Sequence, residues 1–106
     1  MVFDFEGFNW GKFAGTTLPD EFKSGLYGCF SKVKDEDVIV DIGAGVGAVP
    51  WFILTNNKKP KRIHMVEPYP PNQYIIKQNL QALKKNFPGL SDSPENICSI
   101  INHSIS

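Results

Sequence analysis

The residues best suited to ligand chemistry are an acid followed by three alternating glycines. Asp41 follows the apolar residues 38–40, and Gly43, Gly45 and Gly47 follow it at every second position. Glycines allow backbone angles that other residues avoid, and they let a ligand approach the chain without meeting a Cβ atom. Ligands of open α/β sheets bind where a strand ends in such a turn. The pattern therefore predicts a nucleotide-type binding turn.

Two classes of ligand use a turn of this kind. Gly43, Gly45 and Ala48 match G-x-G-x-x-A, in which backbone N–H groups and a helix N-terminus hold a pyrophosphate. Asp41 favours the other class, because a carboxylate is a poor neighbour for a phosphate and a good one for a cation. S-adenosyl-L-methionine carries a sulfonium and an ammonium group and no phosphate. It is the expected cofactor, with a nicotinamide dinucleotide as the alternative.

A second acid supports nucleoside binding. Glu67 follows Gly47 by 20 residues and ends a second predicted strand. A carboxylate at that place can accept hydrogen bonds from both hydroxyls of an adenosine ribose, in either class of ligand. Without a ligand, Glu67 would be a solvated strand-end acid, Asp41 would stabilise the turn, and the glycines would only allow a tight turn.

The elements that must position these residues follow from periodicity and from glycine and proline. The strand over 38–41 is expected to be buried on both faces. The other expected elements are a helix over 21–32 with Thr17 as its cap, a helix over 46–55, a strand over 61–67, a helix over 72–87 capped by Asn72, a polar loop over 91–95 and a strand over 97–101.

This order of elements predicts a Rossmann-like α/β fold. Alternating strands and helices are joined by right-handed crossovers, so the sheet is parallel and partial, with strand order 3-2-1. Residues 1–35 are expected to form a leading helical cover segment. Residues 36–106 are expected to form a partial S-adenosylmethionine-binding domain.

Composition and charge narrow the class of protein. The 106 residues suffice for one domain at most, and 11 basic residues balance 11 acidic ones. Nucleic acid and anionic membranes are therefore not expected as partners. No stretch resembles a membrane span or a secretory leader, and Cys29 and Cys98 form no metal-spaced or redox pair. We expect a cytoplasmic protein without a metal site.

Two motifs together resemble a known family. The segment from Asp41 to Gly47 looks like a D-x-G-A-x-x-G turn, and residues 67–72, EPYPPN, are similar to E-P-x-P-x-N. Both patterns are found in class I S-adenosylmethionine-dependent methyltransferases of the FkbM-like family. The similarity spans about residues 36–106 and includes Asn79-Leu80 and the segment after the third strand.

The resemblance implies a function and a set of cofactor-binding residues. The function would be transfer of a methyl group from S-adenosyl-L-methionine to an oxygen of a small molecule or glycan. The binding residues would be Asp41, Gly43, Ala44, Gly45, Gly47 and Glu67 around the methionine and ribose, Pro68 and Tyr69 beside the adenine, and Asn102 and His103 near its edge.

The sequence does not identify a catalytic base, although His103, which follows the last predicted strand, is a candidate. Class I methyltransferases place a further strand beside their first, and the predicted sheet lacks it. We therefore expect a fragment, or a sheet completed by a further segment or a partner chain. A non-catalytic cofactor-binding module is the alternative. His64 and the aromatic residues Trp10, Phe13, Tyr27 and Trp51 are expected to pack, and residues 58–62 to form a solvated basic turn.

Overall fold

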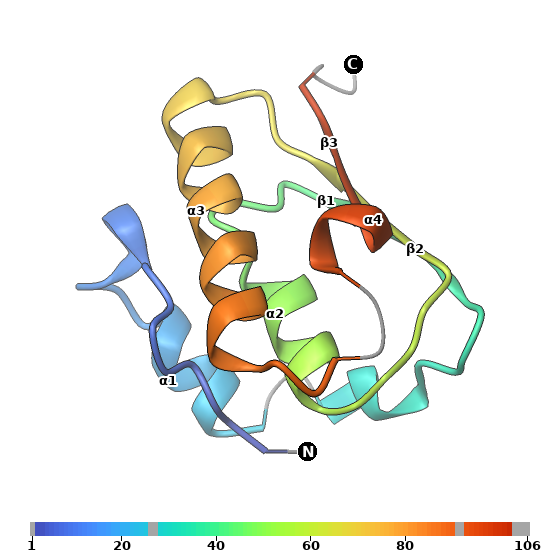
Figure 1. Cartoon of the computed structure of the whole chain (residues 1–106). Helices are drawn as coiled ribbons and strands as arrows, with labels where there is room; N and C mark the ends of the chain where they lie inside the picture. The colour runs from blue at the N-terminus through green and yellow to red at the C-terminus, as the bar shows by residue number, and fades with distance from the viewer. Residues whose placement is uncertain (1, 26–27, 91–92, 103–106) are drawn as a thin grey trace.

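The computed structural model describes residues 2–25, 28–90 and 93–102 (Figure 1). It is an α/β fold with a parallel three-stranded sheet in the order β1-β2-β3, which confirms the predicted fold class and strand order. Along the chain the elements are η1 (Gly11–Phe13), α1 (Leu18–Lys23), η2 (Gly28–Lys32), β1 (Val38–Ile42), α2 (Ala48–Thr55), β2 (Arg62–Val66), α3 (Pro70–Asn86), α4 (Pro94–Ile97) and β3 (Cys98–Ile101).

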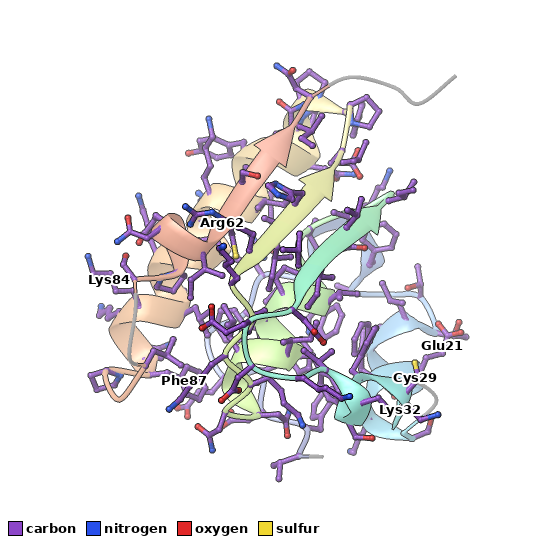
Figure 2. The ribbon with its side chains drawn as sticks, turned by 90° about the vertical axis from the view of Figure 1, so that its right-hand side faces the viewer. Glu21, Cys29, Lys32, Arg62, Lys84 and Phe87 are labelled. Atoms are coloured by element: carbon purple, nitrogen blue, oxygen red, sulfur yellow. The ribbon has the colours of Figure 1, made fainter. Side chains whose placement is uncertain are left out.

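The helices α2 and α3 lie on one face of the sheet, and Figure 2 shows the other face with both helices behind it. The pairing places Ile39, Ile63 and Cys98 side by side. Ile63 and Cys98 are buried against the helices. Because successive residues of a strand point to opposite faces, the next residue of each strand faces away from the helices. One face of the sheet therefore carries the core.

An aromatic cluster joins the N-terminal segment to the same core. Phe5 stacks against Trp51 and Phe52 of α2, with ring centroids 6.2 Å apart in both pairs. The indole N–H of Trp51 donates to the carbonyl oxygen of Asp4 at 2.7 Å. Figure 1 shows the N-terminal segment, in blue, on the side of the helices opposite the sheet. The segment thus forms a third layer over α2 and α3.

Several predicted boundaries were wrong. The helix expected over 21–32 is replaced by α1 and η2, because Gly25 has a φ of +84° that ends the first helix. Helix α3 begins at Pro70, since proline suits the first helical position, and Asn72 is buried within the helix instead of capping it. Thr17 occupies the cap position of α1 but makes no capping hydrogen bond with its side chain. Part of the expected loop before β3 forms α4.

Strand β1 is not buried on both faces as predicted. It lies at the edge of the sheet, and Val38, Val40 and Ile42 are 58%, 57% and 66% exposed. These three side chains alternate with Ile39 and Asp41, which are half-buried. An apolar edge strand of this kind is a template for pairing with another strand.

We expect Val40→Lys to reduce self-association of the purified chain. A lysine on an edge strand opposes strand pairing, and an exposed position should change the free energy of unfolding by less than about 1 kcal/mol. Light scattering over a range of protein concentrations measures the effect. Gln81→Lys, on the exposed side of α3, adds the same charge away from β1. Equal self-association of Val40→Lys and Gln81→Lys would contradict the expectation.

Candidate functional site

The turn after β1 is tied to the end of β2. The backbone N–H groups of Gly43 and Ala44 both donate to the carbonyl oxygen of Val66, at 2.9 and 3.1 Å. Gly47 then precedes α2 with a φ of +88°, in the left-handed region that favours glycine. A Cβ atom at Gly43 would meet no other atom within 4 Å. The turn is therefore held by its backbone and open to a ligand at Gly43.

Glu67 connects this turn with the turn after β2. Its Oε1 accepts a hydrogen bond from the N–H of Gly45 at 2.7 Å, and its Oε2 accepts one from the N–H of Tyr69 at 3.0 Å. Its own N–H donates to the carbonyl oxygen of Ile101 in β3. The side chain of Gln73 donates to its carbonyl oxygen at 2.6 Å. Glu67 is therefore a fixed and buried acid at the carboxyl ends of the strands.

The carboxylate of Asp41 lacks a hydrogen-bond donor for one of its two oxygens in the described part of the chain. Its Oδ2 is buried and accepts no hydrogen bond within the described residues. Burial, and then the negative charge of Glu67, raise the pKa of Asp41 from 3.8 to about 6. A buried carboxylate without a partner is costly, so this place favours a proton, a hydroxyl donor or a positive charge.

Two residues of η1 cover part of the turn. A Cβ atom at Gly45 would lie 3.1 Å from Cε2 of Phe13, so the ring of Phe13 packs directly on this glycine. The ammonium of Lys12 lies 5.5 Å from the centre of the Phe13 ring and 4.9 Å from that of Tyr69. Phe13 is predicted from the sequence only to pack, and Lys12 has no predicted role, because neither residue belongs to a periodic pattern or a motif.

The side chain of Asn79 holds the N-terminal segment that carries η1 beside the glycine turn. It is 3% exposed, and its amide exchanges hydrogen bonds with the N–H and the carbonyl oxygen of Asn9, at 2.8 and 2.9 Å. It also donates to the carbonyl oxygen of Val46 at 2.8 Å. One side chain of α3 thus fastens both the N-terminal segment and the glycine turn. In the sequence, Asn79 follows Ile75 and Ile76 by one helical turn, and a polar residue on the apolar side of a helix is a signal for such a role.

The structure gathers most of the predicted site residues at one edge of the sheet. The three glycines, Ala44, Glu67, Pro68 and Tyr69 lie on the turns that follow β1 and β2, and Asp41 lies within β1, one residue before its end. Asn102 is exposed and follows β3, directly after Ile101. His103 lies outside the described residues.

A second group of charged side chains lies away from the glycine turn. A cavity of about 640 Å³ is lined by Glu36, Lys58, Lys59, Lys61 and Leu90, among others. Since Glu36 precedes β1 and the lysines precede β2, this cavity lies at the opposite end of the sheet from the glycine turn.

Cys98 carries a free and buried thiol in the described part of the chain. No group of three or more His, Cys, Asp or Glu side chains there is placed to hold a metal ion. Burial raises the pKa of the Cys98 thiol to about 12, which keeps it protonated at neutral pH. No helix within the described ranges is long and apolar enough to span a membrane.

Comparisons with known proteins give a structural likeness only. No family model matches the chain, and no curated protein matches it in sequence. The crystal structure of precorrin 8w decarboxylase from Methanobacterium thermoautotrophicum is similar, with a TM-score of 0.62 and 20% sequence identity. The similarity covers 94% of this chain and 47% of that structure, so the chain spans about half of its length. At this identity the likeness establishes the fold.

This comparison overturns the family assignment. The similar structure bears the name of a precorrin decarboxylase, and no FkbM-like model matches. The predictions of an FkbM-like family and of a methyltransferase function are therefore wrong.

The structure explains why residues 67–72 resemble a motif of the FkbM-like family. Pro70 and Pro71 begin α3, Asn72 is buried within it, and Glu67 binds two backbone N–H groups. The E-P-x-P-x-N pattern thus has a structural role that does not require this family.

Proposed function

We propose that this chain forms the cofactor-binding part of an enzyme and that its cofactor is S-adenosyl-L-methionine. The observation that carries the proposal is the buried Oδ2 of Asp41, which receives no hydrogen bond from the described residues and lies beside a second acid, Glu67. Two neighbouring carboxylates repel each other and attract a cation. The sulfonium and ammonium groups supply that positive charge, and the fold binds ligands at this edge of the sheet.

The ribose of the cofactor would bind Glu67. Each carboxylate oxygen of Glu67 accepts one backbone hydrogen bond and has a second lone pair available. Two ribose hydroxyls can donate to these lone pairs without breaking the bonds to Gly45 and Tyr69. The ring of Tyr69 is 50% exposed on the same turn and would lie beside the adenine once the ammonium of Lys12 moves off it.

A dinucleotide fits the same turn less well. A pyrophosphate needs backbone N–H groups that are free to donate. In this turn the N–H groups of Gly43 and Ala44 donate to Val66, that of Gly45 donates to Glu67, and that of Gly47 donates to Ala44. A phosphate would also approach two carboxylates. Both features favour a cationic ligand.

Isothermal titration calorimetry tests the proposal. The chain is titrated at pH 7.5 with S-adenosyl-L-methionine, with S-adenosylhomocysteine and with NAD⁺. We expect saturable binding of the first two and none of NAD⁺. Binding of NAD⁺ alone, or no binding of either adenosyl compound by a chain whose circular dichroism shows it to be folded, would overturn the proposal.

A further inference from the structure

Lys12 is a cation at an otherwise acidic site. Its side chain is exposed, and the contacts recorded for its ammonium within the described ranges are the rings of Phe13 and Tyr69. Phe13 packs on Gly45, and the N–H of Tyr69 donates to Glu67. The ammonium therefore lies beside a ring that packs on the glycine turn and beside a ring carried by the turn after β2.

The backbone that carries Lys12 is fixed, and the end of its side chain is not. A Cβ atom at Gly11 would lie 2.9 Å from Cδ1 of Ile75 and 3.2 Å from Cγ1 of Val46, so η1 packs closely on α3 and on the turn. The bonds between Asn9 and Asn79 hold the preceding residues. A lysine has a flexible four-carbon stem and three donors, so its ammonium can move from the rings to a nearby anion.

The carboxylate of the proposed cofactor cannot form an ion pair with the two acids of the site. The methionine part carries a carboxylate besides its ammonium and sulfonium, and neither Asp41 nor Glu67 can bind a carboxylate. A carboxylate near two acids needs a cation. We propose that Lys12 binds the carboxylate of the methionine part and thereby selects ligands with an amino-acid tail. This inference rests on the function proposed above.

The test compares two ligands that differ by that carboxylate. S-adenosylhomocysteine has it, and S-adenosyl-3-thiopropylamine lacks it but keeps the ammonium. We expect Lys12→Met to lower the affinity for S-adenosylhomocysteine about 5-fold or more and to change the affinity for the second ligand by less than about 2-fold. Lys12→Arg, which keeps the charge, should retain most of the affinity for both.

Lys84→Met is the matched control. Lys84 is exposed in the last turn of α3, whereas Tyr69 precedes the first turn, and Figure 2 shows Lys84 at the far end of the helix. This substitution should leave both affinities unchanged. Equal losses for both ligands in Lys12→Met, or no loss for either, would overturn the role of Lys12 while leaving the proposed cofactor in place. Failure of the unaltered chain to bind either ligand would instead refute the proposed function, and this assignment with it.

Discussion

Asp41→Asn should stabilise the free protein while weakening its binding of S-adenosyl-L-methionine. The pKa of Asp41 is about 6 in the folded chain against 3.8 ordinarily, so the folded state holds this proton more tightly than the unfolded state. The resulting stabilisation is complete below about pH 3.8 and is lost as the pH rises through about 6. Asparagine carries no charge and avoids this loss.

The expected gain in stability follows from the size of the shift in the pKa of Asp41. Relative to the unaltered chain, Asp41→Asn should gain about 2 to 3 kcal/mol in free energy of unfolding between pH 4 and pH 7.5. For a chain of this length, this corresponds to roughly 10 °C in melting temperature. Denaturant unfolding at both pH values measures it. Asp35→Asn removes the same charge from an exposed position and should show no such gain. Equal gains in the two variants would contradict the role of burial at Asp41.

The same variant should bind S-adenosyl-L-methionine at least about 10-fold less tightly at pH 7.5, because it lacks the charge that pairs with the cation. In the unaltered chain, affinity should fall as the pH decreases through about 6, since a protonated Asp41 no longer attracts the ligand. In Asp41→Asn, affinity should not change in that range. A pH-independent affinity of the unaltered chain would contradict a direct contact with Asp41.

Glu67→Ala is expected to destabilise the chain by about 3 kcal/mol, because it removes the acceptor of a buried N–H group and leaves a cavity. The N–H of Gly45 is the buried donor, and that of Tyr69 loses its acceptor as well. Denaturant unfolding at pH 7.5 measures the loss. Unchanged stability would show that these hydrogen bonds do not hold the two turns together.

Glu67→Gln separates the structural role from the binding role. Its remaining carbonyl oxygen can accept from one of the two N–H groups, so about half of the destabilisation should remain. Removing the charge of Glu67 also removes one of the two causes that raise the pKa of Asp41. We expect a folded protein with at least about 10-fold lower affinity for S-adenosylhomocysteine, measured by calorimetry. Unaltered affinity would mean that Glu67 does not hold the ribose.

The order of elements could be predicted because it depends on local signals. Apolar runs gave the strands, and glycine and proline gave their ends. The convergence of Asp41 and Glu67 also followed, since the carboxyl ends of neighbouring parallel strands meet at one edge of a sheet. That these residues bind a cofactor stays a proposal.

Other features depend on contacts between distant parts of the chain. The exposure of Val40 reflects which face the helices cover, and the composition of the strand does not reveal this. Asn9 and Asn79 are 70 residues apart, and their hydrogen bonds are what hold Lys12 over the turn. No local pattern predicts such a pair. The family assignment failed for a related reason, because residues that begin a helix can satisfy a motif.

Above all, we propose that the turn after β1 binds an adenosyl cofactor. Titration of the ¹⁵N-labelled chain with S-adenosylhomocysteine, followed by amide chemical shifts, tests where the ligand binds. We predict saturable changes at Gly43, Gly45 and Tyr69, with smaller ones at Lys12. Changes confined to the cavity beside Lys58, Lys59 and Lys61, or no saturable change at all, would contradict it.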